Sequence, residues 1–157
     1  MKILSIDQST TNVGYCIFDN QEYVESNVIK VHKSNEKKQN EYDFVNKSFQ
    51  IIINLINTYK PDVLVLEEVF AGKSSSVLKQ LATLKGMALG YCYSIQLETC
   101  VVYPTQWKSF IKINGGRSKE KQDVLNFFEQ KYNITINKDD ESDAIGIGYY
   151  FINKNNK

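Results

Sequence analysis

Cysteine and histidine are scarce in this sequence of 157 residues, and their scarcity argues against two classes of protein. There are 3 cysteines and 1 histidine, with no Cys-x-x-Cys pair. Cys16, Cys92 and Cys100 are widely spaced and odd in number, which argues against a disulfide framework and favours buried thiols in a reducing cytoplasm. With His32 as the only histidine, a structural zinc site is not expected.

Long apolar runs and proline are scarce as well. No run approaches the roughly 20 apolar residues that a membrane span needs, and Asp7 interrupts the first apolar run, unlike in a signal peptide. The 2 prolines, with 42% hydrophobic and 24% charged residues, are typical of a folded chain rather than a disordered one. We expect one domain, residues 1–157, with no membrane association. It would act in the cytoplasm, or in the cytoplasm of a host if a phage encodes it.

Apolar periodicity predicts three strands followed by alternating helices and strands. The predicted strands cover residues 2–7, 13–19, 22–31, 62–70 and 100–104, and the predicted helices cover residues 41–59, 75–96, 118–132 and 139–152. Residues 105–111 are expected to form a helical turn, and residues 112–119 a basic, glycine-rich loop. This order predicts an α/β fold of the ribonuclease-H-like type: a mixed five-stranded sheet, antiparallel in its first three strands and flanked by helices.

The stretch "ILSIDQSTTNVGY" (residues 3–15) is the first with recognisable chemistry. Its apolar run ends in Asp7, and a small polar turn leads to Gly14. Sugar and glycerol kinases begin with a similar strand, acid and polar turn, which holds nucleotide phosphates. Nucleases of the ribonuclease-H type also begin with an aspartate at the end of such a strand, where it binds Mg²⁺. Asp7 alone therefore leaves a nucleotide site and a metal site open.

Acidic residues gather at two further places next to apolar elements. Glu67 and Glu68 end a second buried strand, and Asp139, Asp140 and Asp143 open the last helix. Open α/β sheets place their ligand crevice at the carboxyl ends of strands, and acids three apart share one helix face. Gathered together, these carboxylates would repel one another unless a hard cation such as Mg²⁺ were bound. Helix capping or a solvated turn is the alternative for each acid taken singly, but the combination indicates a divalent-metal phosphotransfer site.

Five segments together resemble the RuvC family of Holliday-junction resolvases, in order and in spacing. They read "ILSIDQSTTNVGY", "VLVLEEVF", "SSVLKQLATLKG", "TQWKSFIKINGGRSKEKQDV" and "DDESDAIGIG", and the similarity covers nearly the whole chain. The resemblance implies a ribonuclease-H-like fold, a homodimer, and Mg²⁺-dependent nicking of two opposing strands of a four-way DNA junction. Gln8 and Ser9 depart from the Pro-Gly that the family usually has, and residues 20–40 show little resemblance.

The resemblance implies a set of metal ligands and catalytic residues. Asp7, Glu67, Asp140 and Asp143 match the family's four acids, so they are expected to hold two Mg²⁺ ions per subunit, for which Mn²⁺ can substitute. Glu68 stands where the family usually has Gln, so we do not expect it to be a principal ligand.

Basic and aromatic residues near these acids are expected to contact DNA. The resemblance implies that Lys108 and Lys121 lie near the scissile phosphate and that Phe70 approaches unstacked bases near the crossover. Further basic residues cluster around these two lysines, although the net charge of the chain is only +1. They are Lys112, Arg117 and Lys119. A flexible basic loop can follow phosphates without reading sequence. Lys73, Lys79 and Lys85 are candidates for a second patch, with a merely solvated charged face as the alternative.

The helix predicted at residues 75–96 carries more apolar surface than one buried stripe requires. Val77, Met87 and Leu89 fall outside the stripe, and Gly86 and Gly90 would let another backbone approach closely. A fully buried central helix is the alternative. We favour a homodimer interface, because a two-fold enzyme matches the two-fold symmetry of a four-way junction.

The sequence therefore predicts a structure-selective DNA endonuclease that resolves four-way junctions by paired symmetric nicks, leaving 5′-phosphate and 3′-hydroxyl ends. Another branched-DNA nuclease of the same fold, acting on forks or flaps, is one alternative, and a junction-binding protein with weak catalysis is another. A kinase or ATPase is disfavoured because the chain has no room for a second lobe and a second phosphate loop. The preferred cleavage sequence and a helicase partner stay open.

Overall fold

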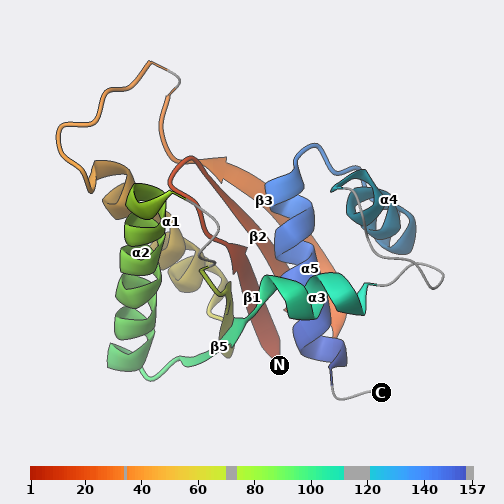
Figure 1. Ribbon diagram of the computed structural model, residues 1–157. Helices are drawn as coiled ribbons and strands as arrows, with labels where there is room; N and C mark the ends of the chain where they lie inside the picture. The colour runs from red at the N-terminus through yellow and green to blue at the C-terminus, as the bar shows by residue number, and fades with distance from the viewer. Residues whose placement is uncertain (34, 70–73, 112–120, 155–157) are drawn as a thin grey trace.

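The strands form one five-stranded sheet with the order β3-β2-β1-β4-β5. The computed structural model describes residues 1–33, 35–69, 74–111 and 121–154, without the side chain of Lys121 (Figure 1). Antiparallel pairing joins β1 (Lys2–Asp7) to β2 (Asn12–Asp19), and β2 to β3 (Glu22–Lys30). Parallel pairing joins β1 to β4 (Val63–Glu67), and β4 to β5 (Glu98–Val102). The predicted fold class is confirmed, with antiparallel order in the first three strands.

Helices cover both faces of this sheet, and each face has its own apolar core. On one face Leu4, Ile6 and Leu64 pack with α1 (Asp43–Tyr59) and α2 (Ser75–Ser94). On the other face Ile3 and Val65 pack with α3 (Pro104–Phe110), α4 (Lys121–Tyr132) and α5 (Asp139–Asn153) (Figure 1). Successive strand residues point to opposite faces, so the odd-numbered residues of β1 and β4 face α5. Among the helices that the structure describes, none has the length and hydropathy of a membrane span.

Most predicted boundaries lie within two residues of the observed ones, and the largest differences are at the fourth and fifth strands. The strand predicted at residues 62–70 is shorter, because β4 ends at Glu67. The strand predicted at residues 100–104 covers Glu98–Val102 instead, since Pro104 is the first residue of α3, a position that suits its fixed φ and missing N–H. The helix predicted at residues 118–132 is described from Lys121 onward, and its predicted first residues, 118–120, lie outside the described residues.

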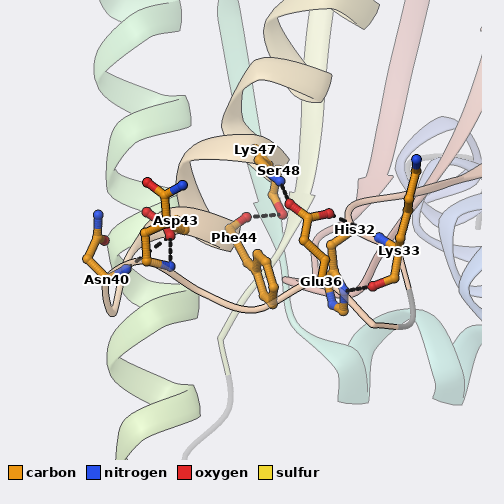
Figure 2. A network of polar contacts seen from close by, with 9 residues as sticks. His32, Lys33, Glu36, Asn40, Asp43, Phe44, Lys47 and Ser48 are labelled. Atoms are coloured by element: carbon orange, nitrogen blue, oxygen red, sulfur yellow. Dashed lines mark hydrogen bonds and ion pairs between the residues drawn. The ribbon is translucent and has the colours of Figure 1, made fainter.

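The polar segment between β3 and α1 is attached to the turn that follows Asp7. The Val31 N–H donates to the carbonyl of Thr11 at 2.9 Å, and the Ser48 hydroxyl donates to the carbonyl of Ser9 at 2.7 Å. Figure 2 shows the contacts that order the segment itself. The His32 ring stacks on Phe44 at 3.9 Å between centroids; Lys47 pairs with Glu36, and the Asp43 carboxylate accepts the backbone N–H groups of Gln39 and Asn40.

Helix α5 lies directly on β1 and β2, and the closest approach is at Gly14. A Cβ atom on Gly14 would lie 2.0 Å from the backbone carbonyl oxygen of Asp140. Strand β1 is also joined to α5 by Ser5, whose buried hydroxyl donates to the carbonyl of Ala144 at 2.7 Å. These two contacts determine how far along the sheet the first turn of α5 lies.

Replacing Gly14 with alanine tests this close packing. Because the obstructing atom is a backbone carbonyl, which cannot rotate aside, we expect Gly14→Ala to lower the free energy of unfolding by about 1–3 kcal/mol. Urea denaturation followed by circular dichroism measures the change. Asn27→Ala, at an exposed position on the neighbouring strand, is the control and should change stability by less than about 0.5 kcal/mol. Equal stability of Gly14→Ala and wild type would contradict the packing described.

Candidate active site

Asp7 and Glu67 end two neighbouring parallel strands at the same edge of the sheet. Ile6 of β1 pairs with Leu66 of β4, so the two acids follow at the same level. Both carboxylates are half-buried. The strand period places both on the face that α5 covers, because Ile3 and Ser5 of β1 and Val63 and Val65 of β4 point the same way.

Asp140 comes to this edge through the backbone contact at Gly14. Asp7 is the cross-strand partner of Gly14, and the backbone of Asp140 passes over that glycine. The Asn12 side-chain amide donates to Asp140 Oδ2 at 3.4 Å. Strand β2 therefore connects the acid of β1 with the first turn of α5.

Helix α3 connects the other two acids. The fully buried Trp107 donates its indole N–H to Glu67 Oε1, with 2.7 Å between Nε1 and Oε1. The next residue, Lys108, places its ammonium nitrogen 4.0 Å from Asp143 Oδ2. Asp143 lies one helical turn after Asp140 on α5, so the four predicted acids, from β1, β4 and α5, lie at one edge of the sheet.

The donor atoms at this edge suit a hard, hydrated dication. Carboxylate oxygens are the ligands that Mg²⁺ prefers. The Gln8 side chain, next to Asp7, is only 6% exposed, and its buried Oε1 atom has no hydrogen-bond partner among the described residues. A buried acceptor without a partner among the described residues leaves a hydrogen bond that a water molecule could supply. Within the described residues, however, no group of three or more His, Cys, Asp or Glu side chains is already close enough together to hold a metal ion.

Glu68 points away from this edge, toward the opposite face. Its carboxylate accepts a hydrogen bond from the Lys85 ammonium on α2 and another from the backbone N–H of Val69 at 2.8 Å. The Lys85 hydrogen bond holds the pKa of Glu68 below its ordinary value. Two adjacent glutamates thus have different partners because the chain alternates between the faces of the sheet.

Few of the predicted DNA-contacting residues lie in the described part of the chain. Lys79 pairs with Glu41 at 3.5 Å and lies over the Tyr42 ring at 5.7 Å from its centroid. Lys85 is paired with Glu68, as described above. Lys121 begins α4, but its side chain is not described. The remaining predicted contacts lie outside the described residues: Phe70, Lys73, Lys112, Arg117 and Lys119.

The buried thiols have no part in this site. The structure shows Cys16, Cys92 and Cys100 as free cysteines; Cys16 and Cys92 are buried as expected, whereas Cys100 is only partly buried. Burial raises the pKa of Cys92 to about 11 and also raises that of Cys16, so both thiols stay protonated and unreactive near neutral pH. This agrees with the expectation of buried thiols at these two positions.

Sequence reasoning missed two side chains that contact Glu67. Trp107 was expected only to pack, yet it donates to the Glu67 carboxylate. Gln8 was noted only as a departure from the family, yet its amide donates to the Glu67 backbone carbonyl at 3.2 Å. For Trp107 the available signal was its position beside a candidate catalytic lysine. For Gln8 no pattern in the sequence would have shown the contact.

Comparison with known sequences points to one family. The family model described as Crossover junction endodeoxyribonuclease RuvC matches residues 3–149. A protein of that name from Prochlorococcus marinus (strain AS9601) is 26% identical over 162 residues, covering 98% of this chain and 98% of the relative. Another of that name, from Christiangramia forsetii, is 29% identical over 136 residues and covers 84% of this chain and 68% of the relative.

Solved structures show the same fold at low sequence identity. RuvC of T. thermophilus, in complex with Holliday junction substrate, superposes with a TM-score of 0.73 and 14% identity over 97% of this chain and 95% of that chain. The Fowlpox virus resolvase, in complex with substrate Holliday junction DNA, gives a TM-score of 0.67 and 16% identity over 100% of both chains. These similarities support the ribonuclease-H-like fold.

Acidification should reveal the pairing of Glu68 with Lys85. A carboxyl whose folded pKa is lowered stabilises the fold above its unfolded pKa, near 4.5, and loses this contribution as the pH falls through the folded pKa. We expect Lys85→Met to cost about 0.5–1 kcal/mol at neutral pH and progressively less below the unfolded pKa. Urea denaturation of wild type and variant at neutral pH and at a pH below the unfolded pKa of Glu68 measures this difference in the free energy of unfolding. The Glu68→Gln/Lys85→Met double variant should be no less stable than either single variant; fully additive losses would argue against the pair.

Proposed function

Because the chain belongs to the RuvC family of crossover junction endodeoxyribonucleases, we propose that it resolves four-way DNA junctions by two symmetry-related nicks. The observation that supports this proposal is the position of Asp7, Glu67, Asp140 and Asp143 along one edge of the sheet. Two proteins with similar structures are described as bound to Holliday junction DNA. In this proposal residues 1–157 act as one nuclease domain in the cytoplasm.

The four acids would hold two Mg²⁺ ions in each subunit, with Mn²⁺ able to substitute. The oxygen-only donor set supports this assignment. Like charges at one edge repel, so a cation lowers the cost of drawing the carboxylates together into a ligand group. When bound, such ions activate water and neutralise charge on the attacking and leaving oxygens of a phosphodiester.

The chain's own residues would position and stabilise the reacting phosphate. In-line attack of water on phosphorus breaks the bond to the 3′ oxygen, which takes up a proton, and leaves a 5′-phosphate and a 3′-hydroxyl. Lys108 lies beside Asp143 with its side chain half exposed, so its ammonium can offset the charge that develops on the phosphate oxygens. Lys121 is the second candidate for this role.

Basic residues would hold the DNA arms. In this proposal Lys73, Lys79, Lys112, Arg117 and Lys119 contact phosphates, and Phe70 stacks on or wedges between bases at the crossover. Lys79 would exchange its surface contact with Glu41 for a phosphate, a small loss because exposed ion pairs contribute little.

Two synthetic four-way junctions, one with a mobile core and one with an immobile core, test the reaction. With Mg²⁺ we expect paired nicks at symmetric positions in opposing strands, with ends that a ligase can reseal. Asp7→Asn and Asp143→Asn should lower the nicking rate by at least about 100-fold, because each removes a charged ligand, while binding of the junction is retained. Glu68→Gln, at the neighbouring acid that pairs with Lys85, is the matched control and should nick at close to the wild-type rate.

The substrate range decides between the proposal and its alternatives. Forks, flaps, linear duplex and an RNA–DNA hybrid are compared with the junction under the same conditions. Faster cutting of forks or flaps than of junctions would indicate a different branched-DNA nuclease. Tight junction binding with intact strands, in Mg²⁺ and in Mn²⁺, would indicate a binding protein and would contradict the proposed reaction.

We also propose that α2 forms the interface of a homodimer. Its buried face packs Leu81, Leu84 and Ala88 into the core. Its opposite face exposes small residues four apart, including Gly86 and Gly90, and a Cβ on either glycine would meet nothing within 4 Å. Tyr93, on the same side, is 88% exposed, so the face combines close access with an aromatic contact.

A charge placed on this face should separate the subunits. We expect wild type to have about twice the 18.1 kDa mass of one chain, and Gly86→Glu to be monomeric, because two-fold symmetry would bring like charges together. Light scattering after size-exclusion chromatography measures the mass. Asn57→Glu adds the same charge to the exposed face of α1 and should remain dimeric. A monomeric wild type, or a dimeric Gly86→Glu, would rule out this interface.

A further inference from the structure

The Glu67 side chain is held by one donor among the described residues, the indole of Trp107. The 2.7 Å hydrogen bond engages Oε1, while Gln8 holds the backbone carbonyl of the same residue at 3.2 Å. We propose that Trp107 and Gln8 form a clamp that orients Glu67 so that its second carboxylate oxygen is presented to a divalent cation. This inference rests on the proposed function of Glu67 as a metal ligand and makes Trp107 a positioning residue.

The Trp107 ring is fixed in place from several sides. It is completely buried, and a Cβ on Gly146 of α5 would lie 2.6 Å from ring atoms Cε3 and Cζ3. On the side of the site, the Lys108 ammonium lies 4.9 Å from the ring centroid. A ring packed against a helix backbone cannot change rotamer without moving α5, so the direction of its N–H is set by the core.

The start of α3 is fixed as well. Pro104 is the first helical residue, and the Gln106 side chain accepts the backbone N–H of Tyr103 at 2.9 Å. These contacts hold the short helix at the end of β5, the strand beside β4. The donor on α3 and the acceptor on β4 are therefore positioned by neighbouring strands of one sheet.

Gln8 supports the clamp from the other side, at the backbone of Glu67. A backbone carbonyl can only accept, so the amide nitrogen of Gln8 must face Glu67, and its Oε1 atom points elsewhere. That oxygen is buried and has no partner among the described residues.

The clamp divides the two oxygens of Glu67 between two tasks. Oε1 accepts the indole N–H, and no other donor to this carboxylate occurs in the described part of the chain. Oε2 then becomes the oxygen for the cation, and Glu67 binds through one oxygen rather than two. A hydrogen bond to one oxygen of a ligating carboxylate also limits rotation of the group, which raises the affinity for metal.

Trp107 is the only tryptophan in the chain, so its fluorescence reports on this clamp directly. Mg²⁺ alone is titrated into the wild-type protein without DNA at constant ionic strength. We expect a saturable change in indole emission, because a cation on Glu67 withdraws charge from the oxygen that accepts the N–H. Glu67→Gln should lose this response, and Glu68→Gln, the matched control, should keep it. An emission that is insensitive to Mg²⁺ in wild type, or equal responses in wild type and Glu67→Gln, would overturn the clamp.

A second arm measures nicking of the junction as a function of Mg²⁺ concentration. Trp107→Phe keeps an aromatic ring but removes the donor, and we expect the half-saturating Mg²⁺ concentration to rise about 10- to 100-fold, with most of the rate recovered at saturation. Gln8→Ala should also raise the half-saturating Mg²⁺ concentration. Phe128→Leu, another fully buried ring in the same core, controls for lost packing and should leave the Mg²⁺ dependence unchanged.

The two arms separate the clamp from the proposed function. Junction nicking by wild type with an unshifted Mg²⁺ dependence in Trp107→Phe would reject the clamp and retain the nuclease. A Mg²⁺-dependent fluorescence change that needs Glu67, in a protein that cuts no branched DNA, would retain the clamp and reject the nuclease. If circular dichroism shows that Trp107→Phe does not fold, the fluorescence titrations of wild type and Glu67→Gln still test the clamp.

Discussion

The backbone contact between Gly14 and Asp140 is the constraint on which the arrangement of the acids depends. The absence of a side chain at Gly14 lets the first turn of α5 rest on β2, directly across from Asp7. A buried hydrogen bond from Ser5 to Ala144 fixes the helix one turn further along. Any larger residue at position 14 would lift the start of α5, and Asp140 and Asp143 would move away from the strand ends together, because they share one helix.

Helix α3 has a second positioning role, although it is only seven residues long. Its adjacent residues Trp107 and Lys108 reach Glu67 and Asp143, which come from β4 and α5. One short helix thus connects the carboxylates of a strand and of a helix. The buried indole supplies a fixed direction, whereas the half-exposed ammonium can exchange a carboxylate for a phosphate. The difference in burial therefore distinguishes Trp107, the positioning residue, from Lys108, the candidate catalytic residue.

The pleat of β4 explains why two adjacent glutamates serve different purposes. Val63, Val65 and Glu67 share the face covered by α5, while Leu64 and Leu66 point to the core beneath α1 and α2. Glu68 continues on that second side and meets Lys85 of α2. Its charge is therefore compensated within the protein, and the charge of Glu67 is available at the strand edge. Repulsion among the remaining acids is the physical reason to expect a cation there.

Much of the fold was predictable from the sequence, because strand alternation and helical periodicity are local properties that do not depend on distant residues. The sequence predicted the first three strands, a buried strand with acids near its end, the acid-headed last helix and, through the family resemblance, the four acids as a group. Boundaries were less accurate where a strand gives way to a helix, as at Pro104. Only the tertiary structure showed that Trp107 donates to Glu67, that Gln8 holds its carbonyl and that Lys85 compensates Glu68. Each of these contacts joins residues 17 to 59 positions apart. Their geometry is set by packing between elements, and no local pattern in the chain encodes it.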